Sequence, residues 1–176
     1  MPVAVQLVFL HGLESGPHGS KFHLLQSLGL GEVLAPDCHG VQDVARRLAM
    51  IEAALGDTPQ LLLVGSSFGG LMALVFAAAH PQQIAGLVLC APAVHRPELV
   101  DLPGSPGGGE LPAVPVRVRH GSQDTVVPLA PVRAFCQAQG LPLQVIDDGH
   151  RLAESHAELA ALVREVWQLC RTPGNG

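Results

Sequence analysis

The sequence predicts an α/β protein in which helices cover both faces of a six-stranded, mainly parallel sheet. Short apolar segments with the composition of strands alternate along the chain with helix-like periods, and this order favours a parallel sheet. Several of the apolar segments are hydrophobic almost without interruption, which is typical of strands buried on both faces. The chain has 176 residues, 48% of them hydrophobic and 14% charged, which is enough for one core. We therefore expect a single domain over 1–171 and a flexible, Pro/Gly-rich tail at 172–176.

Six segments are predicted strands, at 3–10, 32–35, 60–65, 84–91, 114–120 and 141–147. The fifth segment differs from the others because Val116 and Val118 alternate with Arg117 and Arg119. One face of this strand must therefore be partly hydrated or paired with other polar groups.

Five helices are predicted between these strands, at 20–28, 41–55, 68–79, 128–138 and 159–169. The second and fifth carry apolar residues at steps of three and four, which predicts amphipathic helices. Ser20 is the expected N-cap of the first helix, and Pro128 suits the first turn of the fourth. The third is apolar all round, so we expect it to lie buried against the sheet and to end before Pro81.

One stretch breaks the alternation of strands and helices. Residues 95–113 contain four prolines and four glycines, a composition that predicts a flexible loop without a stable helix. The stretch is also too short for a separate cap domain.

Composition excludes several function classes. The net charge of −5, without any cluster of basic residues, argues against a nucleic-acid partner. The N-terminus lacks the features of a signal peptide, and the longest apolar stretch, 71–79, is far shorter than the roughly 18 residues of a membrane span. The cysteines are widely spaced, so we expect no metal site and no disulfide framework but buried, reduced thiols in a cytoplasmic protein. They are Cys38, Cys90, Cys136 and Cys170.

The segment Gly65-Ser66-Ser67-Phe68-Gly69 matches the pattern G-x-S-x-G between a predicted strand and a predicted helix. In a nucleophile elbow this pattern lifts the central serine to the top of the sheet, so Ser67 is the candidate nucleophile. The adjacent Ser66 is expected to be non-nucleophilic. The alternative is a Gly-rich turn that cradles phosphate, but the segment lacks the lysine of a Walker loop and the spacing of a dinucleotide fingerprint.

A serine nucleophile needs a base and an acid that orients the base, and after an elbow these follow in the order acid, then histidine. Asp124 follows the fifth predicted strand and His150 follows the sixth, so they are the candidate acid and base. Each also has a plain structural alternative, as a turn residue and as a solvated loop imidazole. Asp147 and Asp148 lie too close to His150 in sequence to be the favoured acid, although either could tune its pKa.

An acyl-transfer site also needs backbone N–H groups that stabilise an oxyanion. The residue after the nucleophile, Phe68, supplies one candidate donor. Leu13 supplies the other, because His11-Gly12-Leu13 follows the first strand and Gly12 allows a tight turn. His11 is expected to brace this turn and not to carry protons.

The motifs H-G, G-S-S-F-G, H-G-S-Q-D and G-H, in this order, resemble those of the α/β-hydrolases over residues 3–170. This resemblance implies a minimal α/β-hydrolase core that lacks the first two strands of the larger family pattern. It also implies no cap domain, because only the loop 95–113 stands where lids insert, and therefore a shallow, open pocket. It assigns the nucleophile to Ser67, the acid to Asp124 and the base to His150, with Leu13 and Phe68 as oxyanion donors.

Within that family the chain is similar to the small YqiA-type bacterial esterases, through H-G-L-E-S-G-P-H-G-S-K and A-P-A-V-H-R-P-E-L. The stretch D-D-G-H-R-L also resembles acyl-protein and acyl-glucuronide hydrolases of the depalmitoylase group. The resemblance implies a serine carboxylesterase or thioesterase that acts on small-molecule esters or thioesters of short to medium acyl groups and needs no cofactor and no metal. Candidate residues of the acyl pocket are Leu99, Val126 and Leu152. An amidase or peptidase, or a non-catalytic binding protein on the same scaffold, are the alternatives.

Overall fold

The predicted architecture is confirmed by the computed structural model, which describes residues 3–172. Six strands form one sheet of order β2-β1-β3-β4-β5-β6, in which every neighbouring pair is parallel. The strands are β1 (Gln6–Leu10), β2 (Val33–Leu34), β3 (Leu61–Ser66), β4 (Ile84–Cys90), β5 (Val116–Gly121) and β6 (Leu143–Ile146). Of the predicted tail, only Thr172 belongs to the described residues.

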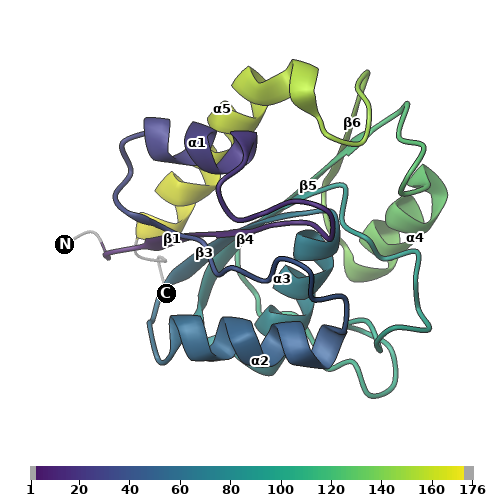
Figure 1. Ribbon diagram of the computed structural model, residues 1–176, viewed down its shortest axis with the longest axis horizontal. Helices are drawn as coiled ribbons and strands as arrows, with labels where there is room; N and C mark the ends of the chain where they lie inside the picture. Colours follow the sequence, from purple (N-terminus) through teal and green to yellow (C-terminus); the bar gives the residue numbers. More distant parts are fainter. Residues whose placement is uncertain (1–2, 173–176) are drawn as a thin grey trace.

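Five helices lie on the two faces of this sheet (Figure 1). They are α1 (Ser20–Ser27), α2 (Val44–Leu55), α3 (Phe68–Ala79), α4 (Leu129–Gln139) and α5 (His156–Arg171), with short 3₁₀ turns at η1 (Pro81–Gln83) and η2 (Ala153–Ser155). Helices α1 and α5 cover one face, and α2, α3 and α4 cover the other. None of the helices in the described part of the chain is long and apolar enough to span a membrane.

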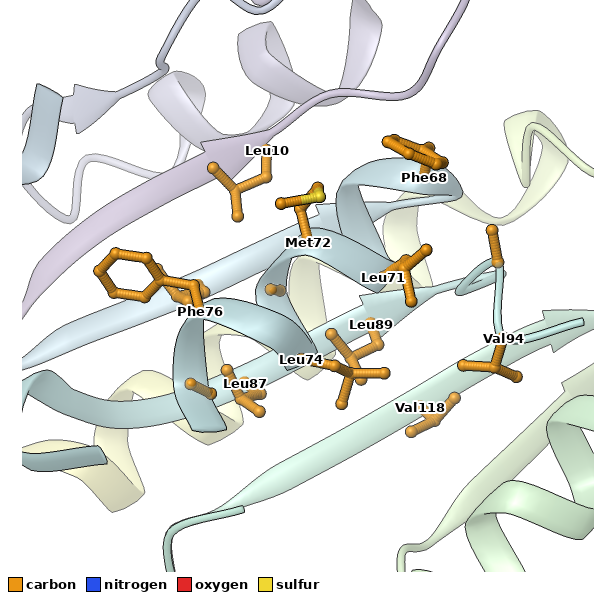
Figure 2. Close-up of a cluster of buried hydrophobic side chains, with 14 of the residues drawn as sticks. Leu10, Phe68, Leu71, Met72, Leu74, Phe76, Leu87, Leu89, Val94 and Val118 are labelled. Atoms are coloured by element: carbon orange, nitrogen blue, oxygen red, sulfur yellow. The ribbon is translucent and has the colours of Figure 1, made fainter. Parts of the chain in front are cut away.

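Strand periodicity divides the core into two layers. In β1, Leu7 and Phe9 pack toward α1 and α5, whereas Val8 and Leu10 pack toward α2 and α3. The uniformly apolar α3 is buried as predicted, and Figure 2 shows its side chains lying over the strands of this second layer.

Several helix starts differ from the prediction: Pro128 is the N-cap of α4 and not part of its first turn, and α5 begins at His156, three residues earlier than predicted. Helix α1 begins at Ser20 itself, because the extended Gly19 is the N-cap and its carbonyl accepts the first helical hydrogen bond, from His23 N. Helix α2 begins at Val44, because Asp43 is its N-cap and Asp43 Oδ1 accepts a hydrogen bond of 2.8 Å from Arg46 N. Val41, which fits the apolar stripe, therefore lies outside the helix.

The loop 95–113 contains no helix, as predicted, but it lies along a face of the molecule. Leu99, Leu102 and Leu111 pack on the core beneath α2, α3 and α4. Gly104 and Gly109 lie against the carboxyl-terminal ends of α4 and α3, respectively. The loop therefore fills the place of a crossover helix between β4 and β5 and continues away from the carboxyl ends of the strands.

The polar face of β5 is partly exposed and partly paired, since the Arg117 side chain is 29% exposed. Arg117 Nη2 lies 3.0 Å from Glu165 Oε1 on α5. Arg119 is fully buried, and its Nη1 donates to Ser155 O at 3.3 Å, whereas its Nε and Nη2 have no hydrogen-bond partner among the described residues.

Candidate active site

Ser67 stands at a sharp turn between β3 and α3. Its backbone has φ 56° and ψ −116°, an unfavourable conformation for a residue with a side chain. The flanking glycines permit the turn: a Cβ on Gly65 would lie 2.5 Å from Gly69 O, and a Cβ on Gly69 would overlap the carbonyl of Leu10. The sequence pattern and the backbone therefore agree on an elbow at this position.

The register of the sheet brings the candidate residues together. Leu10 pairs with Gly65 across β1 and β3, which places the His11-Gly12-Leu13 segment beside the elbow. Gly121 pairs with Ile146 across β5 and β6, so the loops that carry Asp124 and His150 start side by side. All of these segments leave the sheet at the carboxyl ends of its parallel strands, where α/β folds form their sites.

Three side chains from these loops form a continuous hydrogen-bonded chain. His150 Nε2 lies 3.0 Å from Ser67 Oγ, and His150 Nδ1 lies 2.7 Å from Asp124 Oδ2. Because a carboxylate only accepts, we assign the imidazole proton to Nδ1, which leaves Nε2 free to accept from the serine hydroxyl. The Asp124 side chain is fully buried and the His150 side chain is 21% exposed, so the chain runs from the interior to the surface.

The other oxygen of Asp124 is also occupied. Oδ1 accepts hydrogen bonds of 2.8 Å from both Val126 N and Val127 N. The buried His120 lies 3.4 Å from Asp124 Oδ2, but its Nε2 is closer to Val127 O, at 2.8 Å. Asp124 is thus held in one orientation, with Oδ2 presented to His150.

Asp148 closes the loop that carries His150. Its Oδ1 accepts from Gly149 N at 2.7 Å, and its Oδ2 accepts from Ser155 Oγ at 2.7 Å and from Glu154 N at 3.1 Å. Burial alone would raise the pKa of Asp148, but these hydrogen bonds outweigh burial and hold the pKa below its ordinary value. Its carboxylate therefore organises the backbone of this loop.

Two further contacts join this loop to the rest of the site. Gln123 N donates to Asp148 O at 3.1 Å, and Lys21 Nζ donates to Arg151 O at 2.5 Å. Asp147 is exposed and accepts from Gln123 Nε2. Lys21 is the single lysine in the chain, but no local sequence pattern marks its contact with Arg151, which is 130 residues away.

The two candidate oxyanion donors face no competing acceptor. Gly12 N donates to Ser15 Oγ at 3.1 Å, and the next amide, Leu13 N, takes no part in this hydrogen bond. Phe68 N belongs to the first turn of α3, where amides lack helical partners. Within residues 3–172 neither Leu13 N nor Phe68 N donates to another group.

His11 is a buried structural residue, as expected. Its Nδ1 lies 2.7 Å from Gly12 O, and its Nε2 accepts from Cys38 N at 2.9 Å. Burial lowers the pKa of His11, which favours the neutral ring that this pair of hydrogen bonds requires.

Arg47, on α2, is a buried cation that the sequence analysis did not single out. It is 1% exposed, and its guanidinium donates to three backbone carbonyls. The bonds are Nε to Val41 O at 2.6 Å, Nη1 to His11 O at 2.9 Å and Nη2 to Gly12 O at 3.1 Å. Arg47 lies three residues after Val44 and four before Ile51, on the apolar face of the helix, so helical periodicity was a signal that could have separated it from its exposed neighbour Arg46.

The three candidate pocket residues lie in different surroundings. Val126 is 58% exposed on the loop of Asp124. Leu99 is partly buried and packs on the core beneath α2, α3 and α4. Leu152 is 1% exposed in the core beneath α1 and α5, so the structure places it inside the fold and leaves no side-chain surface for a substrate. The strand-to-helix connection after His150 turns inward at Leu152, where φ is 51°.

The cysteines and the other side chains able to bind a metal do not gather into a site within residues 3–172. The four cysteines are free, and burial raises the pKa of Cys136 and Cys170 to about 11. In the part of the chain that the structure describes, no group of three or more histidine, cysteine or acidic side chains is placed to hold a metal ion.

Comparison with known proteins agrees with the fold. A family model described as the alpha/beta hydrolase fold matches residues 7–110. None of the curated proteins matches the sequence.

Solved structures resemble the chain over nearly its whole length. A protein of Xanthomonas campestris pv. campestris described as a hydrolase of the alpha/beta superfamily is 26% identical, with a TM-score of 0.73, over 94% of this chain and 98% of its own. A YdeN-like hydrolase of Pectobacterium atrosepticum is 22% identical, with a TM-score of 0.77, over 96% and 93%. The monoacylglycerol lipase of Paleococcus ferrophilus is 20% identical, with a TM-score of 0.68, over 93% and 94%.

Proposed function

The chain belongs to the α/β-hydrolase family, and from its site we propose that it is a serine hydrolase of carboxylic esters or thioesters with short to medium acyl groups. The observation that carries this proposal is the hydrogen-bonded chain from Ser67 through His150 to the buried Asp124. A serine hydroxyl is a weak nucleophile at neutral pH, and such a chain is the arrangement that activates it.

In the acylation half-reaction, Ser67 Oγ attacks the acyl carbonyl carbon while its proton passes to His150 Nε2. The imidazolium that forms is stabilised by Asp124, whose Oδ2 already lies 2.7 Å from Nδ1. The carbonyl oxygen becomes an oxyanion, for which Leu13 N and Phe68 N are the proposed donors. Collapse breaks the bond to the leaving oxygen or sulfur, which takes the proton from His150 and leaves an acyl-enzyme.

In the deacylation half-reaction, water attacks the acyl carbon and gives a proton to His150 Nε2. The second tetrahedral intermediate uses the same two donors. Its collapse releases the acid, and the proton returns from His150 to Ser67 Oγ. None of these steps requires a metal or an organic cofactor.

Several observations support an ester or thioester as substrate. The motifs resemble those of YqiA-type esterases, and the fold is that of a monoacylglycerol lipase, among others. The loop 95–113 packs on the core beneath α2, α3 and α4 and lies against the carboxyl-terminal ends of α3 and α4. This course leads away from the proposed site and favours a substrate that binds in an open site. Four free cysteines favour a reducing, cytosolic environment.

Hydrolysis of p-nitrophenyl butyrate by the purified protein tests the proposal. We expect turnover by the wild type and its loss in Ser67→Ala, while Ser66→Ala, one residue earlier in the chain, keeps the activity. A fluorophosphonate probe should label the wild type at Ser67, as found by peptide mapping. Turnover in Ser67→Ala equal to the wild type, or labelling at another serine, would contradict the assignment.

A matched panel of oxygen esters, thioesters and amides tests the substrate class. We expect turnover of the first two and not of the amides, because the leaving amine needs recognition that the candidate residues do not provide. A protein that is folded but neither turns over any member of the panel nor reacts with the fluorophosphonate would instead be a binding protein on this scaffold.

A further inference from the structure

The guanidinium of Arg47 lies behind the two segments that carry the proposed oxyanion donors. Two of its nitrogens bond to the carbonyls of His11 and Gly12, on the segment that leads to Leu13. The same guanidinium carbon lies 5.0 Å from the ring centroid of Phe68, whose amide is the other donor. The buried Arg47 side chain thus contacts both of the segments that carry the proposed donors.

The contact with Gly12 O determines where the Leu13 amide points. The Gly12 carbonyl and the Leu13 N–H belong to one planar, trans peptide unit, in which the two groups point in opposite directions. Gly12 O accepts from Arg47 Nη2 at 3.1 Å and lies 2.7 Å from His11 Nδ1. Fixing this oxygen on the interior side directs the N–H of Leu13 to the opposite side.

The charge of Arg47 acts on the same peptide. Burial lowers the pKa of Arg47, but a guanidinium is so weakly acidic that an arginine remains charged at neutral pH inside a protein. A cation bonded to a carbonyl oxygen polarises the peptide and makes its N–H a stronger donor. The effect is strongest for an acceptor that becomes negative during the reaction.

We propose that Arg47 is a positioning residue for the oxyanion hole, which orients and polarises the Gly12–Leu13 peptide and supports Phe68. This inference rests on the proposed function, because it concerns the same intermediate. Arg47 itself touches no substrate, since it is buried behind the segment that would do so.

The role predicts a specific kinetic signature. An oxyanion exists in the transition state and not in the bound ester, so a misdirected donor lowers kcat and leaves KM nearly unchanged. Loss of one such donor typically lowers kcat by about 100- to 1,000-fold. For Arg47→Met, which keeps the aliphatic stem and removes charge and hydrogen bonds, we expect a loss of about 100-fold. Arg47→Lys keeps the charge but not the forked geometry, so its loss should be smaller.

Two control variants on α2 separate positioning from stability. Arg46→Met removes the exposed neighbour and should leave kcat unchanged. Leu55→Ala, at the far end of the helix, empties a buried site and should lower the melting temperature while leaving kcat unchanged. All rates are measured below the melting temperatures and normalised to the sites titrated at the end point by a fluorophosphonate.

The affinity for a trifluoromethyl ketone with the acyl chain of the substrate is the decisive measurement. Addition of the serine oxygen to this ketone generates an oxyanion in the proposed hole. We expect Arg47→Met to lose about as much affinity for it as it loses in kcat, with KM changed by less than about threefold. If Arg47→Met does not fold, the same comparison for Arg47→Lys decides.

The outcomes keep the two proposals apart. If the wild type turns over esters and the Arg47 variant matches Leu55→Ala in both kcat and ketone affinity, the positioning role is wrong and the proposed function stands. If the wild type neither reacts with the fluorophosphonate nor turns over any ester, both proposals fall.

Discussion

Replacing Asp124 by asparagine should reverse the tautomer of His150. Oδ1 of Asp124 accepts from Val126 N and Val127 N, each at 2.8 Å, so the amide oxygen of an asparagine must take this position. The amide nitrogen then faces His150 Nδ1 in place of Oδ2 and donates to it. Because Nδ1 becomes an acceptor, the proton of the neutral ring moves to Nε2, which can no longer receive the proton of Ser67.

The size of the effect follows from this geometry. A triad with the wrong tautomer loses about 10,000-fold in kcat, which corresponds to about 5 kcal/mol in the activation barrier. The backbone hydrogen bonds to Oδ1 are preserved, so stability should change much less than activity.

The assay is hydrolysis of p-nitrophenyl butyrate, with melting temperatures measured in parallel. Asp147→Asn is the matched control, because this exposed carboxylate lies on the same loop as His150 and should leave kcat unchanged. A folded Asp124→Asn variant with kcat within about tenfold of the wild type would refute the reasoning, because it would mean that the tautomer does not depend on Asp124.

Three other substitutions test how the fold holds the site. Gly69→Ala should lower the melting temperature and the esterase activity together, because its Cβ would overlap the carbonyl of Leu10. A melting curve followed by circular dichroism that matches the wild type would contradict this expectation. Asp148→Asn should be less stable than the wild type at pH 7. Because the pKa of Asp148 is lowered in the folded state, the difference in stability is fully present above about pH 4 and becomes smaller as the pH falls further. Urea titrations of both proteins at pH 7, 5 and 3 would measure it. Leu74→Ala, at a fully buried position of α3, should cost about 2–5 kcal/mol and lower the urea midpoint with little change in slope.

The sequence carried most of the information on the sheet and on the elbow. Strand positions follow from apolar runs, and α3 begins at Phe68 and ends at Ala79, as its all-apolar composition predicts. These features depend on local residue types, which a single sequence displays. Helix starts depended on finer chemistry, as Gly19 and Asp43 show, because an extended residue or an accepting side chain decides where the first turn begins.

The contacts that support the site could not be predicted in the same way. Arg47 and Lys21 bond to backbone groups that are remote in the sequence, and Asp148 bonds to backbone groups that follow it around a turn, and no periodic pattern marks such partners. Leu152 illustrates the opposite error: an apolar residue two positions after His150 suggests a pocket, but the connection turns it into the core. The course of the loop 95–113 could not be predicted either, because it depends on where its leucines pack on the core.

The backbone of Ser67 means that this protein loses some stability at its proposed nucleophile. A non-glycine residue at φ 56° and ψ −116° costs about 1–3 kcal/mol, and the surrounding sheet and helix must absorb that cost. A glycine at position 67 would relieve it, so Ser67→Gly should melt at a higher temperature than Ser67→Ala, with neither able to form an acyl-enzyme. The difference between the two melting temperatures would measure how much stability the fold loses by holding the Ser67 side chain in this backbone conformation.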